Sequence, residues 1–153
     1  MTLQKRTKIT EKLKYMEKIA HSMPRTFCLL NHVLTQNQLA ELSEKFNSSE
    51  IVYPEKNLSE LWSQIPPEKS NEEVVESVAF WLKSNATYGD LFIIQGEFGS
   101  TFTLVDFALK NGLVPLYATT RRIAKESRRG EAVSREYIFE HVCFKKYQYF
   151  EMR

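Results

Sequence analysis

The sequence is poor in the residues that mark specialised protein classes. It has two cysteines, five glycines and five prolines in 153 residues, too few for collagen-like or low-complexity chains. Cys28 and Cys143 each lie in an apolar or alternating stretch, which favours buried thiols over a disulfide. The longest apolar runs, residues 27–30 and 91–94, are far shorter than the roughly 20 residues that cross a bilayer. We therefore expect a compact domain with no membrane-spanning helix.

A secretory signal is another feature that we do not find. The first residues are basic and polar, without the continuous apolar core and small-residue cleavage site of such a signal. The expected location is therefore the cytoplasm. Hydrophobic residues make up 42% of the chain and aromatic residues 12%, as in ordinary globular proteins, and this length suffices for one hydrophobic core.

Positive charge is concentrated at the two ends of the chain. Residues 1–22 carry six basic and two acidic side chains, and residues 121–153 carry nine and five. The intervening residues 23–120 carry six basic and twelve acidic side chains. This uneven distribution favours a small anionic ligand over duplex nucleic acid, which usually requires a broad basic face.

Hydrophobic periodicity predicts strands that alternate with helices. Residues 1–22 are expected to form an amphipathic extension, whose helical periodicity runs over residues 10–21. The main domain is expected to span residues 23–153 because Pro24 interrupts the helical pattern. Within that domain we expect strands over residues 25–31, 50–53, 91–95 and 114–119, helices over residues 36–46, 58–65, 71–82 and 101–111, and a C-terminal β-hairpin over residues 123–147 with its turn over residues 127–131. This order predicts an α/β, Rossmann-like fold, with a mostly parallel sheet flanked by helices and closed by the hairpin.

In such sheets ligands bind beyond the carboxyl ends of the strands. Three predicted loops would meet there, and they comprise Asn31 and His32; Gln95, Gly96, Glu97, Phe98, Gly99, Ser100 and Thr101; and Thr119, Thr120, Arg121 and Arg122. In the middle loop, two glycines precede a Ser-Thr pair at a helix start, so backbone amides and hydroxyls are expected to face an anion. The spacing matches neither a Walker A motif nor a dinucleotide fingerprint. Two arginines at the neighbouring strand end would clamp a phosphate.

Several residues near these loops have two possible roles. His32 and His141 are candidate proton donors or acceptors, although packing and hydrogen bonding are the commoner roles of histidines in such positions. Glu97 would orient a ribose hydroxyl or face solvent. Asn31 is a candidate ligand for a base edge, and Phe98 would stack on a base or pack in the core.

Two segments carry a family resemblance. QGEFGSTFTLVDFALKNGLVPLYATTRR and EYIFEHVCFKKY resemble the small CRISPR-associated proteins of type III antiviral systems, which are related to CARF domains and include stand-alone ring nucleases. The resemblance runs from about residue 24 to 147 and excludes the N-terminal extension. It implies a homodimer that binds cyclic oligoadenylate, with cyclic tetra-adenylate as the preferred ring, across the dimer axis.

The resemblance also implies a reaction without metal or cofactor. A ribose 2′-hydroxyl would attack the adjacent phosphodiester and give linear di-adenylate with a 2′,3′-cyclic phosphate, which would switch off antiviral signalling. Catalytic roles are assigned to Arg121, His32 and Ser100. Ligand-binding roles are assigned to Asn31, Gln95, Gly96, Glu97, Phe98, Gly99, Thr101, Thr119, Thr120, Arg122 and His141.

Two other functions compete with this one. A sensor or sponge would bind the cyclic nucleotide with the same residues and leave it uncut. A metal-dependent nuclease would need clustered carboxylates, and the spacing of Asp90, Glu97 and Asp106 does not favour one.

Overall fold

The computed structural model describes residues 2–21 and 23–153, with side chains placed for residues 2–15 and 23–153. It contains ten helices and strands over these ranges, in the chain order α1 (Leu3–His21), β1 (Thr26–Leu29), α2 (Gln36–Phe46), β2 (Ile51–Val52), α3 (Lys56–Ser63), α4 (Glu72–Asn85), β3 (Leu91–Ile94), α5 (Phe98–Lys110), β4 (Val114–Arg129) and β5 (Ala132–Lys146). Each predicted helix and strand is present.

The strands form one mixed sheet in the order β2-β1-β3-β4-β5. The four strands β2, β1, β3 and β4 pair in parallel, and β5 pairs antiparallel with β4. Strand β3 is the middle strand and all four of its residues are buried, as its continuous apolar sequence predicts. The α/β class, the mostly parallel sheet and the closing hairpin are therefore confirmed.

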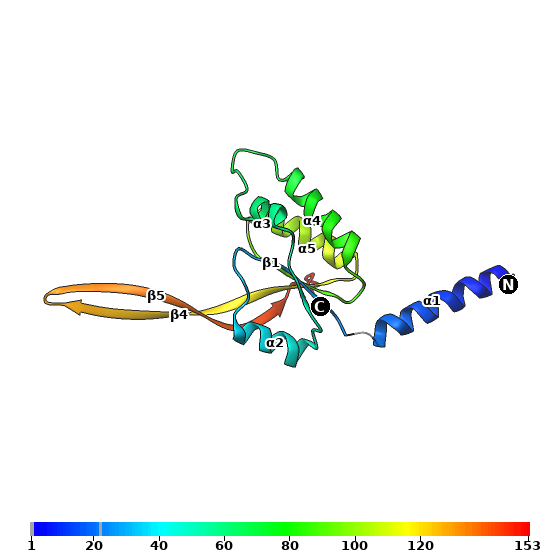
Figure 1. The fold of residues 1–153 in the computed structure, drawn as a ribbon, viewed down its shortest axis with the longest axis horizontal. Coiled ribbons are helices and arrows are strands. Elements are labelled where there is room, and N and C mark those ends of the chain that lie inside the picture. Colours follow the sequence, from blue (N-terminus) through cyan, green and yellow to red (C-terminus); the bar gives the residue numbers. More distant parts are fainter. Residues whose placement is uncertain (1, 22) are drawn as a thin grey trace.

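Helices cover both faces of the sheet (Figure 1). On one face, α3, α4 and α5 contribute Trp62, Val78 and Leu104 to a buried cluster with the strand residues Phe27 and Phe92. On the other face, α2 packs against a second cluster, which includes Cys28, Leu42, Ile93, Leu116 and Phe144. These two clusters, one on each face of the sheet, fix the positions of the strand ends.

Strand β4 is much longer than the predicted strand over residues 114–119. It continues to Arg129 and pairs with β5 from Leu116 onward, so Thr119–Arg122 lie within a strand and not in a loop. A register shift between Thr119 and Thr120 leaves Val142 of β5 as a bulge. Beyond it, residues 120–141, which we call the arm, project from the domain as a two-stranded ribbon (Figure 1).

The arm reverses direction at a glycine turn. Gly130 has a φ of 61°, a left-handed conformation that favours glycine over other residues. This turn lies inside the predicted turn over residues 127–131, so the register of the ribbon follows from the local sequence.

The N-terminal helix α1 is also longer than predicted, because it begins at Leu3 and the sequence pattern indicated residue 10. The side chains of residues 2–15 are exposed. In this part of the chain, as in the rest of the described residues, no helix is long and apolar enough to cross a membrane.

Both thiols are free, as the sequence predicts. Cys28 is buried in β1, and this burial raises the pKa of its thiol to about 12. It therefore stays protonated at neutral pH and packs as a small apolar side chain.

Candidate functional site

The carboxyl ends of three neighbouring parallel strands form the candidate site. Because β1, β3 and β4 are adjacent, the segments that follow them, residues 31–33 and 95–98 together with the first residues of the arm, meet at the same edge of the sheet. We refer to this region as the carboxyl edge. It contains the sequence-predicted site residues, but their arrangement differs from the prediction in four respects.

The first difference concerns Glu97, which caps helix α5. Its carboxylate accepts hydrogen bonds from the amides of Gly99 (3.0 Å) and Ser100 (2.7 Å), and from Nδ2 of Asn71 (2.9 Å). These bonds, above all those from the amides of Ser100 and Gly99, lower the pKa of Glu97, so the carboxylate is ionised at neutral pH. The amides predicted to bind a phosphate are therefore occupied by an anion of the protein itself.

The second difference is that α5 begins at Phe98, three residues earlier than predicted. Ser100 therefore lies in the first turn of the helix and is fully buried. Its Oγ and the Oγ1 of Thr101 are both buried without a hydrogen-bond partner among the described residues. The prediction that these hydroxyls face a ligand is wrong.

Gln95 and Gly96 connect β3 to this helix and have structural roles. The Gln95 side chain accepts a hydrogen bond from the amide of Ala118 (2.9 Å) and donates one to its carbonyl (3.4 Å). The Gln95 carbonyl accepts a hydrogen bond from Nε1 of Trp62 (3.2 Å). A Cβ atom at Gly96 would lie 2.6 Å from Cζ2 of Trp62, so the loop requires glycine for this packing.

The third difference is the orientation of the two arginines. Consecutive residues of a strand point to opposite faces. Leu116 belongs to the core cluster beneath α2, whereas Tyr117 contacts Tyr147 on the side of α5. Continuing this alternation, Arg121 lies on the α5 side and Arg122 on the α2 side. The guanidinium of Arg122 lies 3.5 Å from the centre of the Tyr137 ring, so the predicted clamp of two converging arginines is wrong.

The threonines that precede these arginines differ in exposure. Oγ1 of Thr119 donates to the carbonyl of Cys143 (2.7 Å) and so helps to hold β5 at the bulge. Thr120 is exposed at the start of the arm. Of the two, Thr120 is the one accessible to a ligand.

The fourth difference concerns His141, which is a buried structural residue. Its Nε2 lies 3.2 Å from Oε2 of Glu41, and its Nδ1 lies 3.4 Å from Nε2 of Gln38. The Gln38 oxygen accepts the amide of Thr35 in the capping box of α2, so its amide nitrogen faces Nδ1. This arrangement assigns the ring proton to Nε2, which donates to Glu41. The histidine therefore joins β5 to α2.

Besides Thr120, and besides Glu97 and Arg122 with their contacts inside the chain, four predicted side chains are exposed at the carboxyl edge. Asn31 and His32 are exposed after β1, with Nδ1 of His32 3.1 Å from the carbonyl of Val33. Phe98 is 92% exposed, so it is available to stack on a planar ligand and does not pack in the core. Arg121 is exposed on the adjacent strand. These four side chains offer an amide, an imidazole, an aromatic face and a cation.

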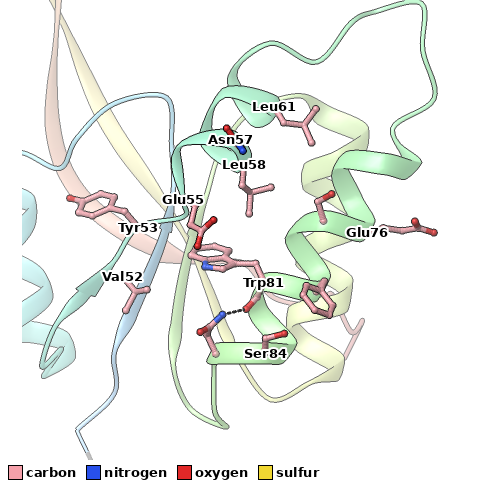
Figure 2. A pocket seen from close by; sticks show the side chains of 12 residues that line it. Val52, Tyr53, Glu55, Asn57, Leu58, Leu61, Glu76, Trp81 and Ser84 are labelled. Carbon is pink, nitrogen blue, oxygen red and sulfur yellow. Dashed lines mark hydrogen bonds between the residues drawn. The ribbon is translucent and has the colours of Figure 1, made fainter.

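A second concave surface is absent from the sequence-based prediction. It is a groove of about 910 Å³ between the β2–α3 segment and α4, and Figure 2 shows Leu58 and Trp81 between these elements. Phe80 lines it and is 75% exposed. The sequence feature that could have revealed this groove is Phe80, an aromatic residue opposite the buried stripe of α4. That stripe is formed by Val74, Val78 and Leu82.

Comparisons with known proteins identify the chain's relatives. Residues 24–145 match the family model described as "Uncharacterized protein MJ1673 family". Uncharacterized protein MJ1673 of Methanocaldococcus jannaschii is 36% identical over 126 residues, which cover 82% of this chain and 98% of the relative. No solved structure matches the chain.

Proposed function

The chain belongs to the MJ1673 family, and we propose that it is a cytoplasmic ring nuclease that binds and cleaves cyclic oligoadenylate, with cyclic tetra-adenylate as the preferred ring. The α/β sheet would be a Rossmann-like, CARF-related domain that acts as a homodimer. The support comes from the carboxyl edge, where parallel strands deliver an exposed arginine, an imidazole, an amide and an aromatic ring.

The observation that carries the proposal is the position of Arg121. It extends beyond the edge on the α5 side, and it forms no ion pair in the described part of the chain, although Glu140 is its cross-strand neighbour. A guanidinium without an ion-pair partner among the described residues, on the strand next to β3 and its following segment with exposed Phe98, suits the phosphates and bases of a small RNA ring. Phe98 would stack on an adenine, and Asn31 would bind its edge.

The proposed reaction uses the substrate's own nucleophile. The 2′-hydroxyl loses its proton to solvent water as its oxygen bonds to the adjacent phosphorus, and the bond from phosphorus to the 5′-oxygen breaks. The leaving oxygen takes a proton from the protonated form of His32, which regains one from solvent. The product ends in a 2′,3′-cyclic phosphate. Arg121 stabilises the negative charge that develops on the phosphoryl oxygens. Proton donation of this kind contributes typically about 10²- to 10⁴-fold to the rate.

The reaction is tested directly with radiolabelled cyclic tetra-adenylate in the presence of EDTA, with the products separated and identified. Linear di-adenylate ending in a cyclic phosphate supports the proposal. Cleavage that occurs only without the chelator contradicts the mechanism, because it would show a dependence on metal ions.

We expect Arg121→Ala to weaken binding or cleavage of cyclic tetra-adenylate by at least about tenfold, as expected for loss of one charge-assisted contact to phosphate. The matched control is Arg129→Ala, which removes the same charge from an exposed position at the tip of the arm. Equal losses in both variants would indicate a general charge effect and remove Arg121 from the site. Unchanged circular dichroism would confirm that both variants fold.

A second candidate function, binding without cleavage, is favoured by the position of Glu97. Since its carboxylate occupies the amides of Gly99 and Ser100, these donors do not stabilise a phosphoryl oxygen unless Glu97 moves. A protein that only sequesters the ring has no need of them. Binding of the labelled ring without any product, with or without metal ions, would support this candidate over the nuclease.

The charge of Glu97 gives a further prediction. We expect Glu97→Gln to tighten binding of cyclic tetra-adenylate by roughly threefold or more at low salt, because one negative charge is removed beside a polyanion, and the gain is expected to shrink as salt increases. Glu131→Gln, at the exposed turn of the arm, makes the same charge change far from the edge. Weaker binding in the Glu97 variant alone would mean that the carboxylate holds the ligand.

A further inference from the structure

We propose that the arm of one copy docks into the groove between α3 and α4 of a second copy, and that the contact is reciprocal. The inference concerns the protein without nucleotide, so it stands or falls independently of the proposed ring nuclease. It rests on three features: the apolar surface of the arm, the composition of the groove, and the distribution of charge between them.

The arm exposes more apolar surface than an isolated ribbon usually does. Its large exposed side chains are Ile123 and Ile138, a cross-strand pair on one face, and Val133, Tyr137 and Phe139 of β5 on the other face, where Phe139 is 66% exposed. A two-stranded hairpin without further packing is marginally stable in water. Contiguous exposed apolar residues of this kind mark interaction sites. We therefore infer that the arm packs against another surface.

The charges of the arm favour a protein surface over a nucleic acid. Six basic residues are interspersed with four glutamates over residues 121–140. Two of these cations already have partners within the arm, because Arg135 binds Glu126 at 2.8 Å and Arg122 stacks on Tyr137. Glutamates spread along both strands would repel a phosphate backbone. They are compatible with a mixed protein interface, which has an apolar centre and a charged rim.

The groove complements the arm in its apolar lining and in its charge. Its apolar lining is Val52, Leu58, Leu61, Phe80 and Trp81. Its charged lining residues are Glu55 and Glu76, and none of the described residues that line it is lysine or arginine. Figure 2 shows Leu58 and Trp81 facing the space between the two helices, and Tyr53 beside it. The face of the basic ribbon that carries Val133, Tyr137 and Phe139 fits such a surface.

The charge of the whole chain points to a second copy as the occupant. Residues 23–120, which build the body of the domain, have twice as many acidic as basic residues, six basic against twelve acidic, whereas the arm has a basic excess. Arms of two copies would therefore repel each other, and an arm and a body would attract. Each copy supplies one arm and one groove, so a two-fold arrangement that makes both contacts at once closes the pair as a symmetric dimer.

The arm is long enough for this contact. From Thr120 to Arg129 it spans ten residues of β4, which corresponds to about 33 Å at the usual rise of a strand. A domain of this size has a radius of gyration of about 14 Å. An arm of one copy therefore reaches across the helical face of another.

The test is sedimentation equilibrium of the full chain without nucleotide. We expect a dimer, and we expect Phe139→Asp on the arm and Phe80→Asp in the groove each to raise its dissociation constant by at least about tenfold, as expected for a charge placed in an apolar interface. Both side chains are exposed, at 66% and 75%, so neither change should disturb folding. The control is Phe102→Asp on α5, which is 78% exposed and lies outside both surfaces.

Mixing the two variants gives the sharper result. A pair formed from one Phe139→Asp chain and one Phe80→Asp chain retains one intact arm and one intact groove, so we expect the mixture to form dimers more tightly than either variant alone. Association of arm with arm would give no such recovery and would overturn the proposal. A monomeric chain, or a loss of association only in Phe102→Asp, would overturn it as well. The proposal would also be overturned if the chain were a monomer and the Phe139→Asp substitution abolished its binding to single-stranded RNA.

Discussion

Replacing Glu41 with alanine is expected to lower the free energy of unfolding by about 2–4 kcal/mol, because a buried acceptor of two hydrogen bonds is lost. Glu41 is 7% exposed on α2. Its carboxylate accepts the amide of Phe144 and Nε2 of His141 on β5. Alanine would leave both donors buried without a partner, and this penalty is larger than the net value of either bond.

The measurement is urea unfolding followed by circular dichroism. Glu44→Ala is the matched control, because Glu44 lies on the same helix and is exposed, and surface substitutions of this kind usually change stability by less than about 0.5 kcal/mol. A small effect of Glu41→Ala would show that water replaces the carboxylate, and that the contact between α2 and β5 is weaker than its geometry suggests.

A substitution of His141 itself separates two possible roles of this residue. As a residue that joins β5 to α2, it should affect stability and leave the affinity of the folded protein for cyclic tetra-adenylate unchanged. We therefore expect His141→Gln to lower stability while binding persists. If binding is lost in a fully folded variant, the ligand-binding role predicted from the sequence holds after all.

The helices and parallel strands could be predicted because their signals are local. Helix α2 spans the predicted residues 36–46, since Thr35 and Gln38 form the capping box that starts it. The buried strand β3 follows from a continuous apolar run. In both cases neighbouring residues determine the element, and distant contacts only reinforce it.

The limits of α5 and β4 depend on contacts that the sequence does not specify. Helix α5 starts early because the side chain of Glu97, and not a serine or threonine, caps it by accepting the amides of Gly99 and Ser100. Strand β4 continues through Thr119–Arg122 because β5 pairs with it from the other side of the turn. A short stretch with two threonines and two arginines is compatible with either a loop or a strand, so pairing decides the outcome.

The candidate site differs from its prediction for the same reason. The sequence placed the right segments at the carboxyl edge, because strand order follows from the alternation of elements. It did not determine which side chains were already engaged. Glu97, Gln95 and His141 bind other parts of the chain, and only the folded structure shows that they are less available to a ligand than Arg121.

The other large effect is expected at Asp90, where substitution by alanine should lower the free energy of unfolding by about 3–5 kcal/mol, as for other buried carboxylates that lose their partners. Asp90 is 3% exposed just before β3. Its carboxylate accepts the amides of Arg25 (3.0 Å) and Thr87 (2.9 Å), and lies 3.3 Å from Nη2 of Arg25. One side chain thus joins the start of β1 to the turn that leads into β3.

Two further variants distinguish the hydrogen bonds from the negative charge. Glu60→Ala is the control, because this exposed carboxylate binds Lys56 on the same helix, and such pairs contribute about 0.3–0.5 kcal/mol. Asp90→Asn keeps one oxygen acceptor but turns an amide group toward a main-chain donor, so we expect an intermediate loss. If Asp90→Asn is as stable as the wild type, the charge contributes nothing. If it is as unstable as Asp90→Ala, the carboxylate is required in full, because both amides at the amino ends of β1 and β3 need an acceptor at once.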